Sequence, residues 1–250
     1  MNARPDVSLR PLDRLTAPEE NVLRLGLLGG FQLRSEAGAI PLAPHLERLL
    51  AFLALQGRSV HRAYVAGRLW MDHSEENAHG CLRTTLWRIG RLPRSPVEAT
   101  TTHLGLAPAV VVDAHELESS AERVLFRGEV RPRDIDVLVH AGDLLPDWYD
   151  DWIAQERERL RQLRLLALDA AGDGLIEAGR FTEAVLVALA AIAADPIRES
   201  AYRLLIRAQV GEGNVGEALR QAAVYRAQLQ RELGLEPSDR MQELLQEIAR

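Results

Sequence analysis

The sequence contains no lysine, a single cysteine and no long apolar run, and the last two of these features exclude several classes of protein. Cys81 cannot by itself supply a disulfide framework within the chain or a zinc site made of several cysteines. No apolar stretch approaches the roughly 18 residues that a membrane helix needs. Acidic residues occupy the N-terminal segment where a signal peptide has its apolar stretch. We therefore expect a cytoplasmic protein with no membrane partner. Neither a Walker loop nor a Rossmann fingerprint is present, so no cofactor is expected.

Charge is distributed unevenly along the 250 residues, a length that suits two domains of ordinary size. Residues 1–112 hold 13 arginines against 10 acidic residues, whereas residues 113–250 hold 17 arginines against 26 acidic residues. All 30 basic residues are arginine, a bias to which we give no functional weight, although arginine is well suited to bidentate contacts with phosphate and guanine. The first half therefore suits an anionic partner such as nucleic acid, which the acidic second half would repel.

The chain opens with a segment that has no periodicity, so we expect residues 1–20 to form a flexible tail. Short apolar pieces separated by glycines then predict a small antiparallel sheet. Its expected strands lie at 22–29, 32–34 and 40–42.

Helical signals follow this sheet. Leucines spaced i, i+3, i+4 and i+7 from Leu46 predict a helix that Gly57 ends. A second helix is expected over about 62–70, and a third begins after the capping residue Ser74 and runs to about Leu92. Two further strands are predicted at 97–100 and 103–106, with a possible third at 110–112. Three helices followed by a hairpin predict a winged helix-turn-helix domain over residues 21–112.

The third predicted helix has two different faces. Helical spacing directs Ala78, Leu82, Leu86 and Ile89 inward. The opposite face then carries Gly80, Arg83, Thr84, Trp87, Arg88 and Arg91. Arginines, a hydroxyl and an aromatic ring are what a helix in the major groove of DNA uses. The alternative is a solvated helix face on which Trp87 packs against the wing or against a partner subunit, and for Trp87 alone we favour packing over a base contact.

The second half reads as nearly continuous helix from Asp151 to Arg250. Turn signals at Gly179, Asp195-Pro196, 211–214 and Glu236-Pro237 divide it into helical hairpins. The segment 179–184 recurs at 213–218, an offset of 34 residues, which is the period of tetratricopeptide repeats. The equivalent alanines, Ala184 and Ala218, are expected where helices cross. We predict a mainly α fold in which a tetratricopeptide-like array over residues 113–250 follows the winged helix and its small sheets.

Several strings of residues resemble a known family. GDLLPDWYDDW at 142–152, DPIRESA at 195–201 and ELGLEPS at 232–238 are similar, in this order, to signatures of the bacterial transcriptional activator domain. RLLAFLAL at 48–55 and LRTTLWRI at 82–89 resemble helices of the OmpR-type winged helix that precedes this domain in the actinobacterial SARP regulators. The resemblance extends over about residues 22–247.

The resemblance implies a transcriptional activator that binds direct repeats in double-stranded promoter DNA as a homodimer and recruits RNA polymerase. By position, Arg83, Thr84, Trp87 and Arg88 would enter the major groove. The wing residues Thr101, Thr102 and His103 would meet the adjacent backbone or minor groove. Gly90 stands where the family helix often carries another arginine, and the wing lacks the usual Gly-Tyr pair.

Two other function classes remain as alternatives. Gly90 and the missing Gly-Tyr pair of the wing favour a protein-interaction scaffold whose winged helix no longer reads DNA. An enzyme is disfavoured, because the carboxylates Asp147, Asp150 and Asp151 beside Trp148 and Trp152 fit better as helix N-terminal charges next to two aromatic core residues. Cys81 has no histidine and acid in a fixed pattern near it, and the histidines offer no convincing metal site.

Overall fold

A computed structural model describes residues 22–250, so the predicted tail over residues 1–20 lies outside the described residues. The first sheet begins with three antiparallel strands: β1 (Leu23–Gly26), β2 (Gln32–Ser35) and β3 (Gly38–Ala39). The third strand was predicted two residues too late, at 40–42. The chain turns back within residues 36–37, and Gly38 (φ 120°) resumes pairing at once. Ile40 still donates its N–H to the Leu33 carbonyl before the chain leaves the sheet.

The winged helix has the predicted order of elements, except for a two-residue strand between its first two helices that was not predicted. Its helices are α1 (Pro44–Gln56), α2 (Arg62–Leu69) and α3 (Glu75–Ile89). Its second sheet has the order β4-β6-β5, made of β4 (Val60–His61), β5 (Val97–Ala99) and β6 (His103–Leu106). Gly57 ends α1 in the left-handed conformation, and the Ser74 hydroxyl accepts the Asn77 N–H at the start of α3, both as predicted.

The strand predicted at 110–112 exists, but it belongs to the other sheet. β7 (Val110–Val112) pairs in parallel with β1, which gives the order β3-β2-β1-β7. The next helix, α4 (Asp113–Arg127), begins at the following residue. The Asp113 carboxylate accepts the N–H groups of Leu27 (2.9 Å) and Leu28 (3.0 Å). The start of α4 is therefore tied to the first sheet.

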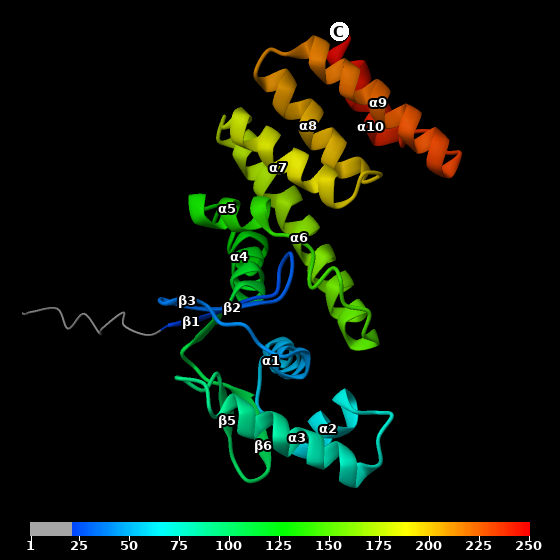
Figure 1. Ribbon diagram of the computed structural model, residues 1–250. Coiled ribbons are helices and arrows are strands. Elements are labelled where there is room, and N and C mark those ends of the chain that lie inside the picture. The colour runs from blue at the N-terminus through cyan, green and yellow to red at the C-terminus, as the bar shows by residue number, and fades with distance from the viewer. Residues whose placement is uncertain (1–21) are drawn as a thin grey trace, which may run out of the picture.

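The second half is the predicted array of helical hairpins, and Figure 1 shows its helices stacked one above another toward the C-terminus. After α4 come α5 (Pro132–His140), α6 (Asp151–Glu177), α7 (Phe181–Ala194), α8 (Glu199–Gly211), α9 (Val215–Leu233) and α10 (Asp239–Ile248). Each hairpin packs on the next, with α4, α6 and α8 in one layer and α5 against α7 in the other. The mainly helical fold class is confirmed.

The 34-residue repeat appears in the backbone. Gly179 and Gly213, which occupy equivalent positions, both take left-handed φ angles, 71° and 84°. The helices α7 and α9 begin two residues after these glycines. Ala184 and Ala218 are fully buried, as expected for positions where helices pack closely.

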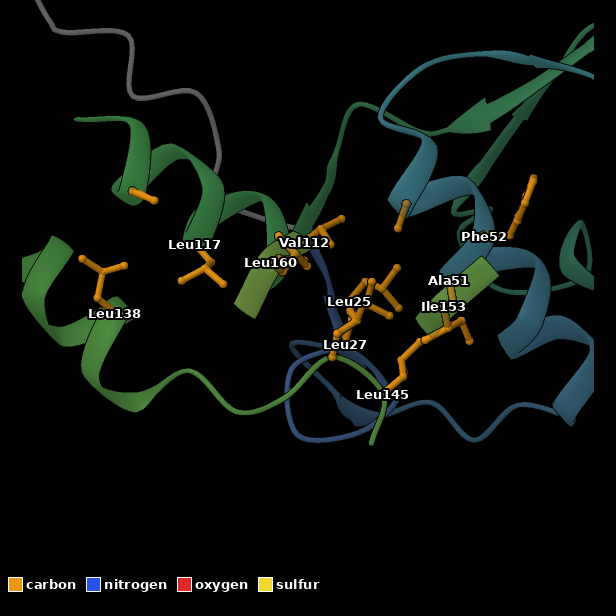
Figure 2. Close-up of a cluster of buried hydrophobic side chains, with 14 of the residues drawn as sticks. Leu25, Leu27, Ala51, Phe52, Val112, Leu117, Leu138, Leu145, Ile153 and Leu160 are labelled. Atoms are coloured by element: carbon orange, nitrogen blue, oxygen red, sulfur yellow. The ribbon is translucent and has the colours of Figure 1, made fainter. Parts of the chain in front are cut away.

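One apolar core connects the first sheet, α1 and the array. Figure 2 shows side chains from β1, α1, α4, α5 and α6 in this cluster. Trp152 is buried with its ring edge-to-face on Phe52 (5.2 Å between centroids), and Trp148 stacks on Phe31 (6.0 Å). The two tryptophans therefore pack as predicted. Asp150 forms an ion pair with Arg48 of α1.

Candidate nucleic-acid interface

The inward face of α3 is close to the prediction but differs at two positions. Ala78, Leu82 and Ile89 are buried, whereas Leu86 is only half-buried. Thr85 is 1% exposed and also lies on this face. Its burial is tolerated because its Oγ1 donates a hydrogen bond to the Cys81 carbonyl (2.8 Å), so the buried hydroxyl has a partner. The sequence did not predict this burial, because threonine is a polar residue.

The helix also ends earlier than predicted, at Ile89 rather than near Leu92. Gly90 donates its N–H to the Leu86 carbonyl, and the chain then leaves the helix through a turn. Pro93 disfavours helical geometry at the residue before it, which explains why Leu92 is not helical. As a result, Arg91 lies in the turn just beyond the helix.

Of the residues predicted for the outward face, Gly80 is half-buried and the other five are exposed. They are Arg83, Thr84, Trp87, Arg88 and Arg91. Trp87 is 61% exposed, so the alternative in which it packs against the wing is wrong, whereas packing against a partner subunit stays a prediction. The Arg91 guanidinium lies over its ring, 4.7 Å from the centroid, in a cation–π contact. An aromatic–arginine pair is thus presented to solvent at the end of α3.

Two outward side chains are held by hydrogen bonds within the winged helix. Thr84 Oγ1 donates to the Gly80 carbonyl (3.1 Å), which uses the hydroxyl proton and leaves the oxygen as an acceptor. Arg88 Nη1 lies 3.1 Å from Nε2 of His45, the second residue of α1. Both residues line a groove of about 640 Å³ beside α3, together with His45, Trp70, His73 and Arg83.

The arginines of α3 and of the turn after it differ from those of the array in their partners. Most arginines of the array form ion pairs with carboxylates, including Arg123–Asp134, Arg159–Glu118, Arg161–Glu158, Arg198–Asp169 and Arg207–Asp173. By contrast, Arg83, Arg88 and Arg91 form no ion pair with a carboxylate anywhere in residues 22–250. Their charges are not neutralised within the described chain and are available to an anionic partner.

The wing residues Thr101, Thr102 and His103 are exposed at the turn between β5 and β6. Thr100 Oγ1 accepts the N–H groups of Thr102 (3.3 Å) and His103 (2.9 Å), which fixes the turn. The Thr102 carbonyl accepts the N–H of Arg62, the first residue of α2 (2.8 Å). Figure 1 shows α3 and the β5–β6 hairpin together at the end of the molecule opposite the C-terminus.

Other kinds of site find no support in residues 22–250. No three histidine, cysteine, aspartate or glutamate side chains lie close enough there to hold a metal ion. No helix in that part of the chain is long and apolar enough to cross a membrane. Cys81 is a half-buried free thiol.

Parts of the chain are similar in sequence to known proteins. Residues 137–249 match the family model described as "Bacterial transcriptional activator domain". The chain contains a bacterial transcriptional activator domain. "Regulatory protein AfsR" of Streptomyces coelicolor is 30% identical over 250 residues, which cover 92% of this chain and 24% of that protein. AfsR of Streptomyces griseus is 26% identical over 215 residues, covering 81% of this chain and 22% of that protein. The chain spans about a quarter of the length of these relatives.

A solved structure shares the fold. The chain of Mycobacterium tuberculosis EmbR, solved in complex with a low-affinity phosphopeptide, superposes with a TM-score of 0.66 at 22% identity. The match covers 92% of this chain and 65% of that one. The resemblance to SARP-type regulators that the sequence motifs indicated is confirmed by the family model and by the similarity to AfsR, and the EmbR structure shows that the fold is shared.

Proposed function

We propose that this regulator binds double-stranded promoter DNA through its winged helix and acts by binding rather than by catalysis. In this proposal α3 enters the major groove, where Arg83, Thr84, Trp87 and Arg88 reach the bases or their phosphates. Arg91 contacts the backbone beside the end of the helix. Thr101, Thr102 and His103 of the wing meet the adjacent backbone or minor groove.

The observation that carries this proposal is the set of arginines without carboxylate partners on α3 and in the turn just after it. Three guanidinium groups project from one short exposed surface, and none pairs with a carboxylate in residues 22–250. Arginine contributes to DNA binding in two ways: it neutralises phosphates, and it reads the O6 and N7 atoms of guanine in the major groove. In the array most arginines pair with carboxylates, whereas these three are unpaired and lie on one exposed surface, which suits an anionic ligand.

The array supplies the protein contacts in the same proposal. We divide the chain functionally into a DNA-binding domain over residues 21–112 and an effector domain over residues 113–250, whose acidic excess would repel DNA. A helical-hairpin array presents extended surfaces suited to protein partners. We assign these surfaces to RNA polymerase and to a second copy of the chain on DNA, which makes the regulator an activator that binds direct repeats.

A protein-interaction scaffold is the competing proposal, and one observation favours it. Tyr64, Met71 and Trp87 of the winged helix are each at least half exposed, and exposed aromatics and methionine are enriched at protein interfaces. If this surface bound a protein instead of DNA, removing Trp87 would matter more than removing Arg83 or Arg88.

Two single substitutions test how α3 would read DNA. We expect Arg88→Ala to weaken binding to a specific duplex by about 1–3 kcal/mol while random DNA changes less, because a base contact is lost. We expect Arg91→Ala to weaken both duplexes alike, because a phosphate contact carries no sequence information. Fluorescence anisotropy on both duplexes measures the difference. Equal losses on both DNAs for both variants would contradict base reading by Arg88.

A further inference from the structure

The side chain of His45 comes from α1 but lies against the outward face of α3. Pro44 and His45 are the first two residues of α1, and His45 is half-buried there. Its Nε2 atom is 3.1 Å from Arg88 Nη1. Both residues line the groove beside α3. A residue from a different helix therefore touches one of the two arginines to which we assign base recognition.

The chemistry of this contact fixes the state of the imidazole. A guanidinium has N–H donors and no acceptor, so Nε2 must accept the hydrogen bond from Arg88. His45 is then neutral, with its proton on Nδ1. Burial, and then the charge of Arg88, lower the pKa of His45 below its ordinary value of 6.5, which favours the neutral form.

Arg83 provides an internal comparison. It extends from the same face of α3 but makes no hydrogen bond or ion pair with any residue in the described part of the chain. A free arginine must lose rotamer freedom when it binds, whereas a side chain already held in place loses less. Arg88 is therefore the better prepared of the two for a contact that requires a fixed orientation.

We propose that His45 is a positioning residue for DNA recognition: by accepting one N–H of Arg88, it holds the guanidinium so that its remaining donors meet a guanine edge. The proposal rests on the proposed function. The contact uses one of five guanidinium N–H groups, and a bidentate guanine contact needs two. His45 then affects sequence discrimination, while phosphate binding depends on the arginine charges themselves.

Protonation of His45 should abolish this effect. An imidazolium has no acceptor nitrogen and carries a charge that repels the guanidinium. The groove also contains His73, Glu76, Cys81 and Arg83, and Glu47 and Arg48 neighbour His45 on α1. A pH effect on its own could therefore arise from these other groups. The test needs a variant in which a hydrogen-bond acceptor that does not titrate replaces His45.

The test uses the full chain and a duplex enriched by the wild-type protein from a random library. The ratio of affinities for this duplex and for scrambled DNA is measured by anisotropy. We expect His45→Phe, which removes the acceptor, to lower this ratio by about tenfold, or about 1.4 kcal/mol. His45→Gln keeps an acceptor oxygen and should keep most of the ratio. The salt dependence should be the same in all three proteins, because no phosphate contact is lost.

Two further measurements separate positioning from a general structural effect. In an Arg88→Ala background, His45→Phe should cause no additional loss, because the residue that it positions is gone. Because the pKa of His45 is lowered, the pH is taken from about 7.5 to about 5, well below the ordinary histidine pKa. This change should reduce the ratio for the wild type more than for His45→Gln.

Failure of positioning by His45 can be distinguished from failure of DNA reading by α3. An equal loss from His45→Phe with and without Arg88, or an equal loss from Gln and Phe, overturns positioning by His45 while DNA binding stands. If no duplex is enriched, or if Arg88→Ala binds the enriched duplex like the wild type, the proposed base reading by α3 fails and positioning fails with it.

Discussion

Gly172 lies where α6 crosses α8, and the structure leaves no room there for a side chain. A Cβ atom at this position would lie 2.2 Å from Cδ2, 2.7 Å from Cδ1 and 2.9 Å from Cγ of Leu204. Leu204 is 3% exposed, so its side chain cannot swing out into solvent. We predict that Gly172→Ala forces α6 and α8 apart and destabilises the protein.

The magnitude follows from two opposing effects. Overpacking a filled core costs about 1–3 kcal/mol, and a clash with three atoms of one fixed side chain places this site near 3. Alanine is better than glycine in a helix by about 1 kcal/mol. The free energy of unfolding should therefore fall by about 2 kcal/mol.

Gly216 offers a matched control within the same array. It lies in the first turn of α9, and a Cβ there would meet nothing within 4 Å. Gly216→Ala should therefore raise the free energy of unfolding, by no more than about 1 kcal/mol. Urea denaturation of both variants measures the two changes. Shifts of the midpoint in the same direction, or an unchanged midpoint for Gly172→Ala, would refute the reasoning.

Three other predictions concern contacts of Arg157, Ala218 and Glu199 within the array. Arg157 donates to the carbonyls of Leu144 (2.7 Å), Leu145 and Trp148 (2.9 Å). Arg157→Ala should therefore cost about 2–4 kcal/mol in urea denaturation, since three acceptors lose charged donors, and Arg157→Lys should recover part of it; a loss below about 0.5 kcal/mol would contradict this role. Ala218→Trp should lower the melting temperature by overpacking the array, and an unchanged value would refute the placement of Ala218 at a helix crossing.

The third of these predictions is pH dependence at Glu199. Burial raises the pKa of this carboxyl, but hydrogen bonds from Ser238 and the charge of Arg203 outweigh burial and lower it below 4.5. The stability that this contributes is present above pH 4.5 and is lost as the pH falls through the lower folded-state pKa. Glu199→Gln should flatten this acid limb of stability against pH; an unchanged limb would rule the residue out as its source.

Much of the fold could be predicted because local signals agreed with tertiary packing. Gly57, Ser74 and the glycines of the 34-residue repeat marked helix ends through backbone chemistry that does not depend on distant residues. The partner of β7 could not be predicted, because a short apolar strand does not indicate which sheet it joins. The strand predicted at 40–42 failed for a local reason, since its register depended on where the turn at 36–37 closed.

The candidate site also has features that the sequence predicted and features that it could not predict. Helical spacing was sufficient to place Arg83, Thr84, Trp87 and Arg88 on one exposed face. It could not reveal His45, which reaches Arg88 from 43 residues earlier in the chain. Nor could it show that the arginines of α3 lack carboxylate partners, because ion pairing depends on how the array and the winged helix each fold.

The central claim is that α3 binds DNA through its arginines, and one comparison tests it most directly. Arg83→Ala/Arg88→Ala is compared with Arg127→Ala/Arg240→Ala, which removes the same charge from exposed arginines of the array. Both are titrated against the enriched duplex at about 50 and 200 mM salt, where binding through phosphates weakens steeply. We predict that the α3 variant loses salt-sensitive binding while the array variant binds like the wild type. Equal binding by the two variants would contradict the account.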